Sequence, residues 1–255
     1  MCTVVFLRRP DHDWPLILAA NRDEMADRPW KPPARHWPDR PEVIAGLDVL
    51  AGGSWLGMND YGVVAGVLNR RESLGPDPRL RSRGELVLEA LEHADAIAAA
   101  EALSHIDPEA YRSFNLFVAD DRDARWLRSL GPGRARSVES LEIPAGVSMM
   151  TAFGLNAPDS ARTARFLPLF EAARPPVPSR DWGDWPDLLA RRDHDEAAGP
   201  REAMRVVTGG GFGTLSSSLI ALGRPDESGP RAAWRFRDTA SDGDWRDVSL
   251  VPAPP

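Results

Sequence analysis

Residues 2–7 read CTVVFL and residues 16–24 read LILAANRDE. The apolar start of each run predicts a strand, at Thr3–Leu7 and at Leu16–Ala20. The intervening residues 8–15 read RRPDHDWP, and their prolines and aspartates favour a turn. Because the two strands of a hairpin are antiparallel, NRDE at residues 21–24 is expected to lie beside the start of the first strand.

Cys2 is the only cysteine of the chain and directly follows Met1. Removal of Met1 would place the Cys2 thiol next to a free α-amine with a reference pKa of about 7.7–8.0, so the amine can act as base for the thiol. The alternative is an ordinary strand residue, because free cysteine is among the most buried residue types. The position of Cys2 therefore defines a candidate nucleophile and leaves a purely structural role open.

Asn21, Arg22 and Asp23 would surround such a terminal amine. The Asp23 carboxylate can hold the ammonium group in place, and the Arg22 guanidinium favours the thiolate. The alternative is a salt-bridged strand end without catalytic function. Spacing alone leaves both interpretations open.

The composition is that of a globular protein, with 42% hydrophobic and 27% charged residues among 255. We expect one domain over residues 1–255, with a frayed tail at residues 251–255. The net charge of −7 argues against nucleic acid as a partner, since phosphate binding needs clustered Lys and Arg. One cysteine forms no intramolecular disulfide, and the five histidines show no metal-ligand spacing. Without a signal-peptide core or a run of membrane-spanning length, we expect a cytoplasmic location.

The remaining pattern alternates strands and helices irregularly. A second hairpin is predicted from residues 54–58 and 63–68, while the proline-rich residues 28–41 are expected to stay outside any sheet and to line a surface cleft. Helical spacing covers residues 84–105, with Asp95 as a cap, and residues 160–173, with Ala164, Phe166, Leu167 and Phe170 on the inner side. Further strands are predicted at residues 114–118, 124–127, 214–222 and 232–237. This order predicts antiparallel sheets packed with helical layers.

Six motifs within residues 1–220 together resemble the NRDE family, which includes the eukaryotic transport and Golgi organisation protein 2. Each motif is short, and their common order makes the resemblance specific. They are Cys2-Thr3-Val4, Asn21-Arg22-Asp23-Glu24, Gly53-Ser54-Trp55-Leu56-Gly57, Asn69-Arg70, Ser82-Arg83-Gly84 and Phe114-Asn115-Leu116.

The NRDE family is in turn similar to the N-terminal-nucleophile (Ntn) hydrolases of the choloylglycine hydrolase and penicillin V acylase type. This similarity implies an α+β fold, a four-layer αββα sandwich of two antiparallel sheets. In those hydrolases the second strand ends in an Arg-Asn-x-Asp element, which Asn21 and Asp23 match. Ala20 stands where they carry arginine, and Arg22 is the neighbouring side chain that would have to replace it.

The same similarity implies an oxyanion hole. Asn69 and the backbone amide of Arg70 match one donor, and Asn156 is the expected second donor. Such donors matter because the loss of one typically costs about 100- to 1,000-fold in turnover. Asn59, by contrast, is expected to be an ordinary turn residue.

Three residues are expected to contact a substrate. Thr214 and Ser216 belong to a segment that resembles the family's Gly-Thr-x-Ser-Ser element, in which Leu215 replaces the arginine common there. Trp55 is expected to cover the pocket, with core packing as the alternative.

These residues together predict an N-terminal-cysteine amidohydrolase that acts on a non-peptide C–N bond of a small molecule without a cofactor or metal. The alternative is a non-enzymatic carrier of haem or of a lipid or acyl-CoA in the same cleft, because eukaryotic relatives are linked to such ligands. Haem would need an axial donor, for which Cys2 or His36 are candidates. A haemin titration that shows a Cys2-dependent Soret shift would favour the carrier.

Overall fold

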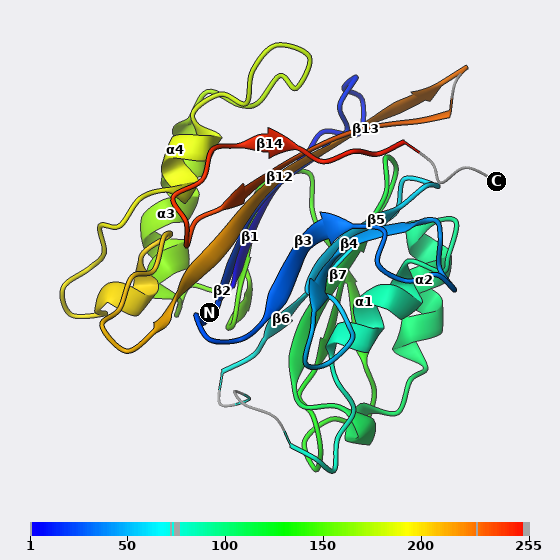
Figure 1. The fold of residues 1–255 in the computed structure, drawn as a ribbon, viewed down its shortest axis with the longest axis horizontal. Helices are drawn as coiled ribbons and strands as arrows, with labels where there is room; N and C mark the ends of the chain where they lie inside the picture. The colour runs from blue at the N-terminus through cyan, green and yellow to red at the C-terminus, as the bar shows by residue number, and fades with distance from the viewer. Residues whose placement is uncertain (1, 72, 74–76, 228, 252–255) are drawn as a thin grey trace. The chain divides into compact units, whose positions relative to one another are not determined.

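Two seven-stranded antiparallel sheets contain most of the secondary structure, as the sequence pattern predicted. The computed structural model describes residues 2–71, 73, 77–227 and 229–251. Backbone contacts divide the chain into two units, each of which contains most of one sheet. Figure 1 shows the strands of both sheets along the chain. The first unit comprises Met1–Arg28, Pro144–Arg224 and Ala232–Val248, and the second comprises Pro29–Ile143, Pro225–Arg231 and Ser249–Pro255. Met1 and most of the predicted frayed tail, residues 252–255, lie outside the described residues.

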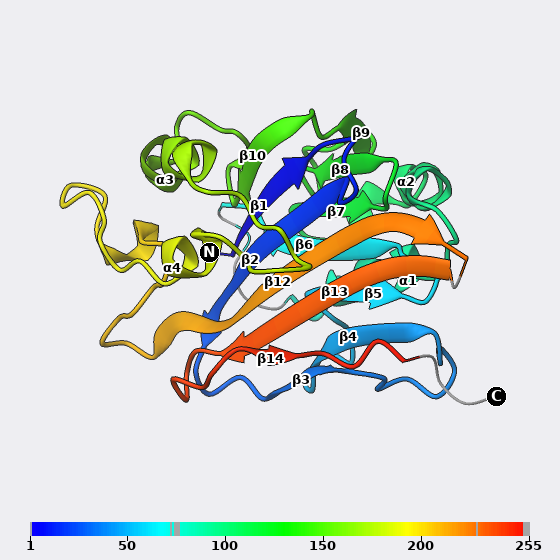
Figure 2. The ribbon, with the colours of Figure 1, turned by 90° about the horizontal axis from the view of Figure 1, so that it is seen from above.

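The sheet of the first unit has the strand order β11-β10-β1-β2-β12-β13-β14. Figure 2 shows β1, β2, β12 and β13 side by side, with the start of β1 at one end of the sheet. The strands are β1 (Thr3–Arg8), β2 (Leu16–Met25), β10 (Gly146–Thr151), β11 (Gly154–Leu155), β12 (Phe212–Asp226), β13 (Gly229–Asp238) and β14 (Arg246–Asp247).

The predicted N-terminal hairpin is confirmed, with Thr3 opposite Asn21. The second strand is longer than predicted, because β12 continues the pairing along NRDE as far as Met25. On its other side β1 pairs with β10, which was not predicted. The strand β1 therefore has a paired strand on each side, and Cys2 directly precedes its first residue.

Helices α3 (Ala161–Ala172) and α4 (Trp185–Leu189) pack on one face of this sheet, followed by the short 3-10 helix η2 (Pro200–Glu202). Their core contains Phe166, Phe170 and Trp185. The predicted inner side of α3 is partly wrong: Ala164 is exposed, whereas Arg162 is fully buried.

The sheet of the second unit has the strand order β3-β4-β5-β6-β7-β8-β9. Its strands are β3 (Trp30–Ala34), β4 (Val43–Asp48), β5 (Leu56–Asn59), β6 (Val64–Asn69), β7 (Phe114–Ala119), β8 (Ala124–Ser129) and β9 (Glu139–Glu142). The expectation that the proline-rich residues stay outside the sheet is wrong, because Trp30–Ala34 pairs with β4 as an edge strand. The pairing shifts register between Lys31 and Ala34, where Pro32 and Pro33 have no N–H to donate.

Helices α1 (Gly84–Ala90) and α2 (Ala96–Ser104) cover one face of this second sheet, and η1 (Pro108–Ala110) follows them. The predicted cap is confirmed, since the Asp95 carboxylate accepts a hydrogen bond of 2.8 Å from the Ala98 amide. Leu116, Val118 and Leu127 face these helices. Their neighbours Asn115, Phe117 and Trp126 therefore project from the helix-free face.

The outermost strands of both sheets are short or chemically unsuited to further pairing. In the second unit, β3 carries Pro32 and Pro33, and the exposed β9 carries Glu139 and Glu142. In the first unit, β11 and β14 have two residues each. Of the described helices, none has the length and hydropathy that a membrane-spanning segment requires.

Candidate active site

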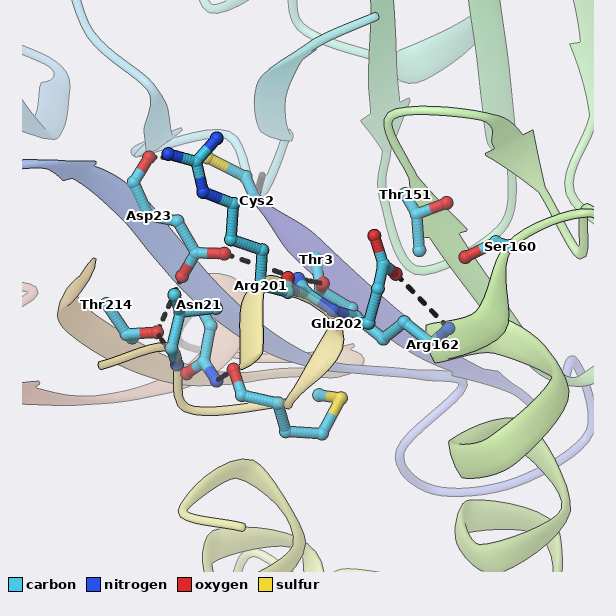
Figure 3. Close-up of polar contacts among 12 residues, drawn as sticks. Cys2, Thr3, Asn21, Asp23, Thr151, Ser160, Arg162, Arg201, Glu202 and Thr214 are labelled. Carbon is cyan, nitrogen blue, oxygen red and sulfur yellow. Dashed lines mark hydrogen bonds and ion pairs between the residues drawn. The ribbon is translucent and has the colours of Figure 1, made fainter. Parts of the chain in front are cut away.

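The Cys2 thiol lies against the main chain of β2. Its Sγ donates a hydrogen bond to the Asp23 carbonyl oxygen at 3.7 Å, and the residue is half-buried. Because Thr3 lies opposite Asn21, strand alternation places the Cys2 and Arg22 side chains on one face of the sheet and the Asp23 carboxylate on the other. The structure therefore brings Cys2 to residue 23, but to its carbonyl and not to its carboxylate (Figure 3).

The surroundings of Cys2 raise the pKa of its thiol above the ordinary value. Burial is the largest cause, and the negative charge of Asp23 adds to it. The hydrogen bond to the Asp23 carbonyl and the positive charge of Arg22 act in the opposite direction but do not outweigh them. At neutral pH the thiol is therefore protonated and needs a base before it can attack a carbonyl.

Alkylation of Cys2 by iodoacetamide should therefore show a pH midpoint above that of an unstructured cysteine peptide in protein that retains Met1. Arg22→Gln is expected to move the midpoint to higher pH, because it removes a charge that favours the thiolate. Asp23→Asn is expected to move it lower, because it removes a charge that opposes the thiolate. Alkylation rates from pH 6 to 11, measured by mass spectrometry, test both signs; a midpoint that moves in the same direction in both variants would contradict this electrostatic picture.

The Asp23 carboxylate forms a fully buried ion pair with Arg162 of α3. The Arg162 NH1 group lies 3.3 Å from Asp23 Oδ2, and their side chains are 1% and 0% exposed. The Thr214 hydroxyl donates to the other carboxylate oxygen at 2.6 Å. Arg162 also donates to Thr3 Oγ1 and to the Arg201 carbonyl oxygen, so one guanidinium connects α3 to both strands of the Cys2 hairpin and to η2 (Figure 3).

The buried Asn21 side chain connects the sheet to the helical layer through hydrogen bonds. Its Nδ2 group donates to the carbonyl oxygens of Leu189 at 3.0 Å and Met204 at 2.8 Å. Its Oδ1 atom accepts a hydrogen bond of 2.6 Å from the Ser217 hydroxyl. Its Nδ2 group and its Oδ1 atom are therefore occupied within the fold, and a catalytic role of Asn21 stays a prediction.

A β-bulge separates the two predicted substrate contacts on β12. Thr214 lies opposite Asp23 and Ser216 lies opposite Arg22, with Leu215 as the extra residue between them. Thr214 therefore belongs to the face of the Asp23 carboxylate. Ser216 lies on the same face as Arg22 and Cys2. These three side chains therefore occupy neighbouring positions on that face, on β12, on β2 and just before β1.

Asn156 lies away from the thiol. Its Oδ1 atom accepts from the Met149 amide at 2.7 Å, and its Nδ2 group donates to Ser148 Oγ at 3.2 Å. Met149 pairs with Val5, which lies three residues along β1 from Cys2, about 10 Å at ~3.3 Å per residue. The structure therefore places Asn156 at the end of β11 and does not bring it to Cys2 as an oxyanion donor.

The other predicted residues belong to the second unit. Asn69 ends β6, and the next residue, Arg70, donates to Asn115 Oδ1 at 2.7 Å. The Trp55 ring lies over Gly46, where a Cβ atom would come within 2.3 Å of it, and meets Trp30 edge-on. His36 lies within hydrogen-bonding distance, 2.8 Å, of the Pro32 carbonyl oxygen. The oxyanion role of Asn69 and Arg70 stays a prediction.

Sequence reasoning missed Arg162, the central side chain of this site. The signal was an arginine in the first turn of a predicted helix, where the positive end of the helix dipole disfavours a cation. Such a placement indicates a specific anionic partner. Among the described residues, no group of three or more His, Cys, Asp or Glu side chains could hold a metal ion.

Residues 1–155 match the model of the family described as "Transport and Golgi organisation 2". The chain belongs to this family. The Transport and Golgi organization 2 homologue of Mus musculus is 35% identical over 128 residues, and the Homo sapiens homologue is 37% identical over 130 residues. Each match covers 47% of this chain and 45% of the relative, so the chain spans less than half of the length of these curated relatives. Cys2, Asp23 and Asn69 lie within the family match, whereas Arg162 and Thr214 lie beyond it.

Solved structures show the fold. An N-acylethanolamine-hydrolyzing acid amidase orthologue from Caenorhabditis elegans matches with a TM-score of 0.54 and 13% identity, over 86% of this chain and 92% of that chain. A mutant of the conjugated bile acid hydrolase from Clostridium perfringens matches with a TM-score of 0.49 and 11% identity, over 98% and 97%. The amidase match and the two antiparallel sheets confirm the predicted Ntn-hydrolase-like fold class.

Proposed function

We propose that this protein is an amidohydrolase whose nucleophile is Cys2, freed at its amine by removal of Met1. The observation that carries the proposal is the position of the thiol. The thiol directly precedes β1 and donates a hydrogen bond to the Asp23 carbonyl oxygen. It lies on the same face of the sheet as the Arg22 side chain. The fold shared with an amidase supports a C–N bond as the target.

The raised pKa of the thiol defines what the reaction requires. The free α-amine of Cys2 takes the thiol proton while sulfur attacks the amide carbonyl carbon. The C–N bond then breaks, and the departing amine takes the proton from the ammonium group. Water hydrolyses the resulting thioester, which releases the carboxylic acid and restores the thiol. The positive charge of Arg22 favours both the thiolate and the negative charge that develops on the carbonyl oxygen.

Intact-mass measurement of the protein with a slowly hydrolysed amide or activated ester tests this mechanism. We expect one acyl group per chain, mapped to Cys2, in protein that lacks Met1. The matched control carries a leucine inserted between Met1 and Cys2, which prevents methionine removal and should leave the cysteine thiol unacylated. Equal acylation of both forms would contradict a role for the terminal amine.

The alternative is a carrier that binds an amphipathic ligand, such as haem or an acyl-CoA, without chemistry. Burial and the charge of Asp23 keep the thiol in its weakly nucleophilic protonated form unless a base acts on it, and a carrier would need no such base. Saturable ligand binding by protein that lacks Met1, without acylation or turnover across an amide panel, would favour this alternative over the hydrolase.

A further inference from the structure

We propose that the helix-free face of the second sheet contains a binding site for an oxyanion, a carboxylate or phosphate group of a small ligand, built around Arg70 and Asn115. This inference concerns the side chain of Arg70, not its backbone amide, and does not depend on the chemistry proposed at Cys2. It rests on how arginine side chains gather at the ends of β6 and β8.

Asn115 provides the fixed point of the site. It is fully buried in β7, and its Oδ1 atom accepts hydrogen bonds from Arg70 NH1 at 2.7 Å and from Trp126 Nε1 at 3.1 Å. The two donors hold the amide in one orientation. The guanidinium of Arg70 is therefore positioned before any ligand arrives, which lowers the entropic cost of binding.

Arg70 is a half-buried cation that forms no ion pair with a described residue, although the more distant Glu139 carboxylate favours its charged form. The Arg70 NH1 group donates a hydrogen bond to the neutral amide oxygen of Asn115. Its remaining N–H groups keep the fork geometry that binds a carboxylate or phosphate through two parallel hydrogen bonds.

Further arginines strengthen the positive potential around Arg70. Burial lowers the pKa of the Arg70 guanidinium, and the positive charges of Arg128 and Arg134 lower it further. The Arg128 guanidinium lies 5.3 Å from the centre of the Trp126 ring and pairs with Glu139 at 2.8 Å. Arg70 is thus exposed to the positive charges of two further arginines and to the negative charge of Glu139, and an anion beside Arg70 would relieve the repulsion among the arginines.

Calorimetric titration with inorganic phosphate and, separately, with succinate tests the site at constant ionic strength set with sodium chloride. We expect saturable binding of at least one of the two anions. Arg70→Gln should weaken it about tenfold or more, because a charge-assisted hydrogen bond is lost. Arg79→Gln is the matched control, since Arg79 is an exposed arginine of the same unit that pairs with Asp77, and it should leave the affinity unchanged.

Glu139→Gln is expected to strengthen anion binding, an effect that a misfolded protein would not show. Removal of this exposed carboxylate frees Arg128 and should strengthen anion binding about two- to fivefold. Absence of saturable binding for both anions, or equal affinities of the wild type and Arg70→Gln, would overturn the proposal. Weaker binding in Glu139→Gln would also overturn it.

Discussion

Replacement of Arg162 by methionine is expected to lower the free energy of unfolding by about 3–5 kcal/mol. The variant keeps most of the side-chain volume but leaves the Asp23 carboxylate fully buried without its cation. Thr214 would remain as a hydrogen-bond donor to Asp23, and one hydroxyl does not compensate a buried charge. Denaturant-induced unfolding, followed by circular dichroism, measures the loss.

Arg165→Met is the matched control on the same helix. Arg165 pairs with Asp193 near the surface, where their side chains are 39% and 38% exposed, so its loss should cost less than about 1 kcal/mol. The double variant Arg162→Met with Asp23→Asn should recover part of the stability, because the uncompensated charge is gone. A cost for Arg162→Met no larger than that for Arg165→Met would show that this ion pair does not hold α3 to the hairpin.

Cys2→Ala is expected to abolish amide hydrolysis, with a loss on the order of 10⁶-fold in kcat, as when a hydrolase loses its nucleophile. The fold should persist, because the half-buried thiol contributes one long hydrogen bond to a carbonyl. Steady-state hydrolysis of an amide panel, measured beside thermal unfolding of the same samples, separates the two effects.

Arg165→Met also controls this second experiment, since it changes a surface charge without touching the hairpin and should retain turnover. Hydrolysis by Cys2→Ala at the wild-type rate would remove the nucleophile assignment. Loss of structure in Cys2→Ala would instead show that residue 2 is required for folding, and Cys2→Ser, which retains a polar side chain, would then serve as the catalytic test.

The N-terminal hairpin could be predicted because residues close together in the sequence determine it. Apolar runs, a turn rich in proline and aspartate, and antiparallel geometry suffice to bring Asn21 opposite Thr3. The strand β10 could not be found in this way, since Met149 and Val5 are paired across more than 140 residues. The edge strand β3 was excluded on the general rule for prolines, although an edge tolerates them.

The candidate site also has features that depend on nearby residues and features that depend on residues distant in the sequence. Proximity of Cys2 to residue 23 follows from the hairpin, whereas the choice between the carbonyl and the carboxylate of Asp23 depends on strand alternation and on a partner from α3. Asn156 was assigned from family resemblance, but its side chain binds Met149 and Ser148 instead. Contacts that depend on tertiary packing, such as those of Arg162, could only be seen in the structure.

The outermost strands also govern how molecules of this protein meet one another. An open sheet border offers unpaired N–H and C=O groups to a neighbouring chain, which is a common route to aggregation. In the second unit, Pro32 and Pro33 remove donors from one border of the sheet, and Glu139 and Glu142 place like charges along the other. The sheet of the second unit therefore cannot readily recruit a strand from a second molecule, and we expect it to resist fibre-like association at high concentration.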